Sequence, residues 1–293
     1  MKNFLCIGDL MVDVMVMVES EVHATGDTQA TISTSGGGAA ANVATWLAHL
    51  GNQSHICARV GDDANGDFLL KDLDRYCVSH SKARATGEKS GVVVVLVDEN
   101  GERTMFPDSG SNSGLSISDL PPLDQFDAVY LSGYSLINPR SRVNVTKILD
   151  LCKESKLPVL LDPGTVGALR AVPASLIHDW VSRADILLLN EEEALFITQE
   201  FSLARAFEVL TELCPVVVVK RGSQGVNGQS RGSQIINISA IASEVIDTTG
   251  AGDAFAAGFI SSWFEDANLE RALISGAESA SIAISHVGAR PPL

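Results

Sequence analysis

Short, uninterrupted apolar runs recur along the sequence and constrain its fold more than any other feature. Most are rich in Val, Ile and Leu, and each is bounded by Gly, Pro, Asp or Asn. They cover residues 4–8, 54–60, 128–132, 158–161, 185–189 and 215–220. Because the hydrophobicity is continuous rather than alternating, these runs predict strands that are covered on both faces, as in a parallel sheet.

Segments with helical periodicity lie between the apolar runs. They cover residues 40–50, 139–156, 191–198 and 203–213, and two more, 254–264 and 269–286, close the chain. Strands alternating with helices of this length predict an α/β fold: a doubly wound, Rossmann-like parallel-sheet core with helices on both faces. Internal repeats and Pro/Gly-rich linkers are lacking, so we expect residues 1–293 to form a single domain.

Two regions, roughly 12–35 and 90–108, break this alternation. Residues 12–18, 29–35, 91–97 and 102–106 look like strands without intervening helices. The last two are joined by Asp98-Glu99-Asn100-Gly101, and Asn-Gly is a strong hairpin-turn signal. We therefore predict a small antiparallel β sheet, inserted into the core, that forms a lid over the carboxyl edge of the main sheet.

The charge balance limits the partners of the chain. Its formal net charge is −15, and its Lys and Arg residues form no basic stripe, so nucleic acid and anionic membranes are repelled. Five widely spaced cysteines without a C-x-x-C motif are typical of reduced core residues in a cytosolic protein. The N-terminus is a poor signal peptide and no apolar run could span a membrane, which together predict a cytoplasmic protein.

The run Asp247-Thr248-Thr249-Gly250-Ala251-Gly252-Asp253 carries the strongest chemical signal. Its small residues leave the backbone open, and their amides would begin the helix that follows. A helix N-terminus of this kind binds anions and can stabilise developing phosphoryl charge. Asp253 in the first turn can accept a proton from an attacking hydroxyl. The helix dipole favours its ionised form, which would make it a weak base.

A second Gly-rich run, Gly36-Gly37-Gly38 followed by Ala-rich residues and Asn42, precedes a predicted helix. It is either a site of close approach to a ligand or a flexible loop before a helix. Asp13 lies within an apolar strand, where an unpaired carboxylate is costly. It therefore reaches solvent at a strand end, a hydrogen-bond partner, or a polyol with vicinal hydroxyls.

Two further segments follow predicted core strands. Asn190 with Glu193 forms a capping-box pattern, and Glu193 is alternatively a residue that orders a hydrated Mg²⁺ near phosphates. Lys220, Gly222 and Gly225 lie at the end of the strand that covers residues 216–219. They form either a simple turn or a contact with nucleotide phosphates.

Together these motifs resemble the ribokinase, or PfkB, family of carbohydrate kinases along nearly the whole chain. Residues 37–44 resemble its N-terminal signature, residues 61–66 its Gly-Asp-Asp loop, and residues 247–253 its more specific C-terminal signature. The resemblance implies a ribokinase-like core with a β lid. It also implies an ATP- and Mg²⁺-dependent kinase that phosphorylates the hydroxymethyl group of a sugar or nucleoside.

The resemblance also implies a role for each matching residue. Asp253 would be the catalytic base, with Gly250, Ala251 and Gly252 as the anion hole, and Asp13, Gly37, Gly38 and Asn42 would hold the substrate. Asn190, Lys220, Gly222, Gly225 and Thr248 would contact ATP, and Glu193 would bind Mg²⁺ through water. Asp247, with the backbone of Thr249, would hold a monovalent cation such as K⁺.

Departures from the ribokinase pattern put ribose itself in doubt. Ala39 and Ala40 stand where ribokinases usually have Lys-Gly, Met11 replaces a common Asn, and Ser111 replaces an Ala. The alternatives are a nucleoside or phosphosugar kinase on the same scaffold and a catalytically silent sugar sensor. Arg103 on the lid hairpin either faces solvent or meets a phosphorylated sugar. Because an exposed lid sheet can pair with a second copy, we also expect a homodimer.

Overall fold

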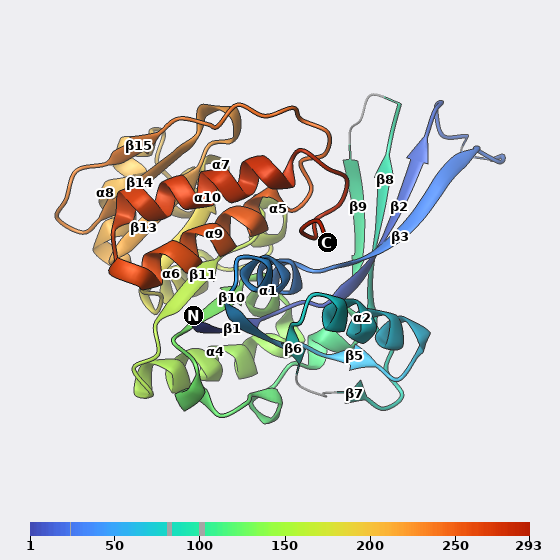
Figure 1. Cartoon of the computed structure of the whole chain (residues 1–293), viewed down its shortest axis with the longest axis horizontal. Helices are drawn as coiled ribbons and strands as arrows, with labels where there is room; N and C mark the ends of the chain where they lie inside the picture. Colours follow the sequence, from blue (N-terminus) through green and yellow to red (C-terminus); the bar gives the residue numbers. More distant parts are fainter. Residues whose placement is uncertain (24, 81–83, 100–102) are drawn as a thin grey trace.

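A mostly parallel sheet of nine strands forms the core of the protein in the computed structural model (Figure 1). The structure describes residues 1–23, 25–80, 84–99 and 103–293. In spatial order the strands of this sheet are β15 (Ile236–Ile238), β14 (Val226–Ser230), β13 (Val216–Lys220), β12 (Ile186–Asn190), β11 (Val159–Asp162), β10 (Ala128–Ser132), β1 (Asn3–Ile7), β4 (Gln53–Cys57) and β6 (Ser79–His80). Neighbours from β13 to β6 run parallel, whereas β14 and β15 run antiparallel. The predicted parallel core is confirmed.

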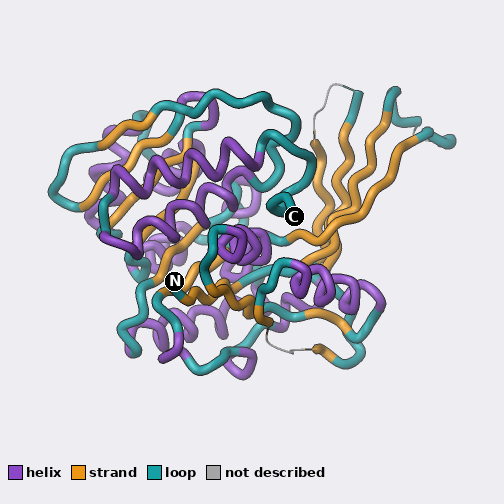
Figure 2. Tube along the Cα trace, in the orientation of Figure 1, coloured by secondary structure: helices purple, strands orange, loops and turns teal. Residues whose placement is uncertain are grey.

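Helices cover both faces of this sheet, as predicted (Figure 2). One apolar cluster contains residues from α1 (Ala39–His49), α2 (Ala64–Arg75), α9 (Ala251–Asp266) and α10 (Leu269–Ala283). The other contains residues from α3 (Tyr134–Ile137), α4 (Pro139–Glu154), α5 (Val166–Leu169), α6 (Ala174–Ser182), α7 (Glu191–Thr198) and α8 (Leu203–Leu213). Along β1, Phe4 and Cys6 join the first cluster, whereas Leu5 and Ile7 join the second. Burial on both faces explains the continuous apolar runs.

A four-stranded sheet projects beside the core (Figure 1). Its order is β3 (Ala30–Gly37), β2 (Met11–Val18), β8 (Gly91–Val97) and β9 (Arg103–Asp108). The outer pairs β2–β3 and β8–β9 are antiparallel as predicted, but the central pair β2–β8 is parallel. The chain passes through the core between β3 and β8, and this long connection permits the parallel pairing. The predicted turn residues Asn100 and Gly101 lie outside the described residues.

The register of the four-stranded sheet decides which side chains share a face. Met17 pairs with Val97, which pairs with Arg103. Because side chains alternate between faces, Asp13 and Arg103 lie on the same face. The opposite face carries Ile32 and Phe106, which are 64% and 56% exposed.

Several shorter features were not predicted from the sequence. The Gly-Asp-Asp loop ends in α2, where Asp63 caps the helix by accepting a hydrogen bond from Gly66 N. Two short strands, β5 (Val60–Gly61) and β7 (Arg84–Ala85), pair beside it. The expectation that all five cysteines are core residues is wrong for Cys77, which is exposed after α2. Among the described residues, no helix combines the length and apolar character needed to cross a membrane.

Candidate active site

The N-terminus of α9 is built from the Gly-rich run at residues 250–252. Gly250 adopts the left-handed conformation at φ 75°, and no side chain caps the helix. A Cβ on Gly250 would lie 2.6 Å from the Cα of Ala289, so both the backbone angle and the packing require glycine. The first amides of an uncapped helix have no intrahelical partner and can bind an anion.

Asp253, in the first turn of α9, meets a residue from the other signature. Asn42 on α1 donates a hydrogen bond from Nδ2 to Asp253 Oδ2 at 2.8 Å, across 211 residues of sequence. The Asn42 side chain is buried, and its Oδ1 has no hydrogen-bond partner in the structure. A buried acceptor without a partner is costly, so a ligand hydroxyl beside Asp253 would satisfy it.

The pKa of Asp253 differs from the expectation based on the helix dipole. Burial and the nearby Asp162 raise it from 3.8 to about 7, although Asn42, Lys220 and Arg290 oppose the shift. The prediction of a weak base is therefore wrong, because loss of hydration outweighs the helix dipole here. A carboxyl that titrates near neutral pH is well matched to general-base catalysis.

This pKa predicts the pH dependence of turnover. Only ionised Asp253 accepts a proton, so kcat/KM should rise with pH through about 7 and level off above it. The profile is measured from initial rates between pH 5 and 9 at fixed ionic strength. A rate that is flat across this range would contradict the assignment of Asp253 as the titrating base.

Asp13 on β2 lies against the Gly-rich run that ends β3. A Cβ on Gly37 would stand 2.2 Å from Asp13 Oδ2, and one on Gly38, where φ is 93°, would stand 2.4 Å from the backbone oxygen of Asp9. The glycines therefore permit close approach of protein to protein around Asp13. Burial raises the pKa of Asp13 to about 6, although Arg290 opposes the shift.

Arg290 is a site residue that the sequence did not reveal. It is 8% exposed, its Nε lies 3.3 Å from Asp72 Oδ2, and its Nη2 donates to the Gly37 carbonyl oxygen at 3.4 Å. Its Nη1 has no hydrogen-bond partner in the structure, and its charge acts on both Asp13 and Asp253. A lone Arg in a Pro-rich C-terminal segment gives no sequence signal of burial.

Three core strands end in polar residues that form a second cluster. Lys220, at the end of β13, donates from Nζ to Asp162 Oδ2 on β11 at 2.9 Å. Burial alone would lower the pKa of Lys220, but Asp162 and Glu193 outweigh burial and raise it. The ammonium also lies 3.4 Å from where a Cβ on Gly252 would stand, beside the α9 N-terminus.

Asp162 was missed in the sequence, although a signal was available. It follows the apolar residues of β11 directly, as Asn190 follows those of β12 and Lys220 those of β13. Polar residues that end neighbouring parallel strands gather at one edge of the sheet, where ligands bind.

The Asn190–Glu193 capping box is formed. Asn190 N and Nδ2 donate to the two carboxylate oxygens of Glu193 at 2.8 and 2.7 Å, and Glu193 N donates to Asn190 Oδ1 at 2.8 Å. Burial and Asp162 raise the pKa of Glu193 to about 7, although Lys220 opposes the shift. Within the described residues, no three His, Cys, Asp or Glu side chains are grouped to hold a metal ion directly. A Mg²⁺ here fits only as a hydrated ion held largely by phosphates.

The remaining predicted nucleotide residues lie at a single 3₁₀ turn, Gly222–Gln224, and in the loop before α9. Gly222 and Gly225 both have positive φ, and they close a tight turn in which Gly225 N donates to the Gly222 carbonyl oxygen at 3.0 Å. A Cβ on Gly222 would meet open space, which leaves room for a ligand. Thr248 is exposed, and its carbonyl oxygen accepts from Ala251 N at 3.3 Å.

Arg103 is exposed, as one of the two sequence expectations had it, but its guanidinium also contacts the loop before α9. Its Nη2 donates to Asp247 Oδ1 at 2.5 Å, and its Nη1 donates to Thr249 Oγ1 at 2.6 Å.

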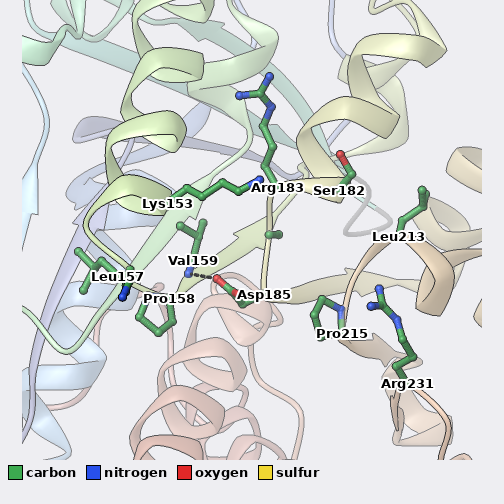
Figure 3. Close-up of a pocket in the computed structure, with 12 residues that line it drawn as sticks. Lys153, Leu157, Pro158, Val159, Ser182, Arg183, Asp185, Leu213, Pro215 and Arg231 are labelled. Carbon is green, nitrogen blue, oxygen red and sulfur yellow. Dashed lines mark hydrogen bonds between the residues drawn. The ribbon is translucent and has the colours of Figure 1, made fainter.

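A separate pocket of about 400 Å³ lies where β11, β12 and β13 begin, at the edge opposite these clusters (Figure 3). It is basic, but two of its cations are already engaged. Arg183 pairs with Asp179 at 3.0 Å, and Arg231 donates to the Thr211 carbonyl oxygen at 2.6 Å. None of the predicted site residues lines it.

Known proteins with similar sequences and structures are kinases. A family profile described as "pfkB family carbohydrate kinase" matches residues 1–293. The fructokinase of Vibrio alginolyticus is 31% identical over 76% of this chain and 75% of its own length. The ATP-dependent ribose-1-phosphate kinase of Halopiger xanaduensis is 28% identical over 99% of this chain and 94% of its own.

A solved structure is similar over nearly the whole fold. The Arabidopsis thaliana ribokinase in complex with ribose and ATP superposes with a TM-score of 0.83, at 26% identity, covering 99% of this chain and 96% of the other. The expected ribokinase-like fold is thereby confirmed. The chain is a sugar or nucleoside kinase that belongs to the pfkB family of carbohydrate kinases.

Proposed function

We propose that the protein transfers the γ-phosphate of ATP to a hydroxymethyl group of a neutral sugar. The observation that carries this proposal is the hydrogen bond between Asn42 and Asp253. It places a carboxyl with a pKa of about 7 beside an unsatisfied acceptor and an uncapped helix N-terminus. A base, a hydroxyl partner and an anion site are what alcohol phosphorylation requires.

The chemistry follows from these positions. The sugar hydroxyl oxygen attacks the γ-phosphorus as its proton passes to Asp253, and the bond from that phosphorus to the β–γ bridging oxygen breaks, with ADP leaving. The amides of Gly250, Ala251 and Gly252 stabilise the charge on the transferring group. Such transition states are loose, so positioning and charge stabilisation matter more than base strength.

The nucleotide would lie along the carboxyl edge of β12 and β13. Asn190, Lys220, Gly222, Gly225 and Thr248 are proposed to contact it, with Asp162 holding the ammonium of Lys220 in place. Glu193 would order a water on Mg²⁺ through the carboxylate lone pairs that the capping box leaves open. The ion, when bound, neutralises phosphate charge.

The pocket around Asp13 favours a neutral polyol. Asp13, Gly37, Gly38 and Asn42 would hold the sugar, and the ionised Asp13 accepts vicinal hydroxyls. The two carboxylates of Asp13 and Asp72 offset the single positive charge of Arg290, so the balance of charge around this residue disfavours an anionic acceptor. Fructose and ribose are the first candidates, because one relative is a fructokinase and the structure of another holds ribose.

Two further features belong to the proposal. Residues 12–35 and 90–108 would act as a lid on a single domain that spans residues 1–293. The exposed face of that sheet, with Ile32 and Phe106, is apolar and would pair two copies into a homodimer. The dispersed cysteines and the acidic charge support action in the cytoplasm without nucleic-acid or membrane partners.

A coupled ADP-release assay tests the acceptor. Purified protein with ATP and Mg²⁺ is offered fructose, ribose, their phosphates and nucleosides in parallel. We expect the highest kcat/KM for a neutral sugar. A higher kcat/KM for a sugar phosphate or a nucleoside would show that the acceptor is not a neutral sugar. Binding of a sugar without release of ADP would indicate a catalytically silent sensor.

A further inference from the structure

Arg103 joins the four-stranded sheet to the loop that precedes α9. It begins β9, on the sheet face that also carries Asp13. Its guanidinium donates to Asp247 and Thr249, which lie 144 and 146 residues away in sequence. The side chain of Asp247 is 7% accessible, so its carboxylate is shielded from water, whereas the side chain of Arg103 keeps 28% accessibility and remains partly exposed.

The Asp247 carboxylate accepts hydrogen bonds at both of its oxygens. Besides Arg103, its Oδ1 accepts from Thr249 N and Oγ1 at 2.9 and 2.7 Å, and its Oδ2 accepts from Gly288 N at 2.9 Å. Among the described residues, the nearest cation to this carboxylate is the guanidinium of Arg103, which pairs with it directly.

A monovalent cation does not fit this arrangement. To bind Asp247 Oδ1, a cation would have to displace the guanidinium of Arg103, which donates one hydrogen bond to that oxygen and another to Thr249 Oγ1. If it bound alongside, two positive charges would lie a few ångströms apart in a partly desolvated site, where like charges repel strongly. The carboxylate that the sequence offered for K⁺ is thus already paired with a guanidinium of the same chain.

We propose that the Arg103 guanidinium takes the place of a monovalent cation at the Asp247–Thr249 loop, so that phosphoryl transfer needs no K⁺. This inference rests on the proposed anion hole at residues 250–252. Arg103 is a positioning residue: it supplies a fixed positive charge beside the helix start and ties that start to the sheet that carries Asp13. The four-stranded sheet thereby positions both the proposed sugar site, through Asp13, and the proposed anion hole, through Arg103.

The test compares wild type with Arg103→Ala, Arg103→Lys and a matched control, Thr104→Ala. Thr104 is the next residue of β9, and its side chain points to the opposite face. Initial rates are measured with chloride salts of K⁺, Na⁺ and tetramethylammonium at equal ionic strength. A second series adds guanidinium chloride at low millimolar concentration.

Wild type and Thr104→Ala should show rates that agree within about twofold across the three salts, because the cation is built in. Arg103→Ala should lose about 10- to 100-fold in kcat/KM, equivalent to about 1.4–2.8 kcal/mol. Part of this loss should return with K⁺ or guanidinium, and less with tetramethylammonium, which is too large for the site. Arg103→Lys should fall between wild type and Arg103→Ala.

Strong K⁺ activation of wild type, or an Arg103→Ala variant with full activity, would overturn the proposal. A variant that is inactive but insensitive to every cation would also overturn it, since a purely structural role predicts that result. A measurement that needs no turnover tests this inference independently of the proposed acceptor. The Tm of Arg103→Ala should be higher in K⁺ than in Na⁺, whereas the Tm of wild type should be the same in both salts.

Discussion

Replacing Asp253 by asparagine is expected to lower kcat by roughly 10³-fold, within the range that a positioned general base contributes. The amide keeps the shape of the side chain and its contact with Asn42 but cannot accept the proton. ATP binding should persist, because the amides of residues 250–252 remain. The coupled assay measures the expected loss of kcat, and calorimetry measures whether the affinity for ATP is retained.

The same variant should be more stable than wild type at high pH. Because the folded state raises the pKa of Asp253 from 3.8 to about 7, folded protein binds this proton more tightly than unfolded protein does. Stability is therefore lost as pH rises from about 4 to 7, and asparagine removes that loss. The Tm of Asp253→Asn should exceed that of wild type at pH 8, and the difference should shrink as pH falls toward 4.

Asp266→Asn is a matched control for this substitution. Asp266 lies in the last turn of the same helix, where it pairs with Arg271 on the surface at 2.6 Å. The charge change is identical, but the site is at the other end of α9. Its kcat should stay within about twofold of wild type, because surface ion pairs contribute little. Near-normal turnover in Asp253→Asn itself would remove Asp253 from the base role.

Replacing Asp13 by asparagine is expected to produce the second large effect, on the sugar rather than on ATP. A hydrogen bond to a charged group contributes about 1.5–3 kcal/mol. Losing one such bond should lower kcat/KM for the sugar by roughly 10- to 100-fold, mostly through KM, while the KM for ATP stays nearly constant.

The pKa of Asp13 gives an independent check. Burial raises this pKa to about 6, so the carboxylate is lost as pH falls below that value. In wild type, the KM for the sugar should therefore rise as pH falls through about 6, whereas in Asp13→Asn it should not change there. Asp27→Asn, at an exposed position between β2 and β3, serves as a control with the same charge change. Equal sugar KM in both variants would exclude Asp13 from the sugar site.

The sequence was informative wherever local physical rules are strong. Continuous apolar runs identified β1, β10 and β13 because strands buried on both faces leave no place for polar residues. The capping box at Asn190 and Glu193 formed as predicted, since it depends only on residues three apart. Predictions failed where a property depends on tertiary surroundings. The pKa of Asp253, for example, depends on burial and on Asp162 more than on the helix that carries it.

Sequence alone therefore determined the class of fold and the family, and it pointed to most of the candidate site residues but not to Arg290 or Asp162, because periodicity and motifs of fixed spacing are local. Tertiary structure decided which of those residues meet. Only the packing of α1 against α9 joins Asn42 to Asp253, and only the burial of the C-terminal segment places Arg290 beside Asp13. Only the fold of the four-stranded sheet delivers Arg103 to Asp247. Such contacts between distant segments depend on how whole elements pack, which no local pattern encodes.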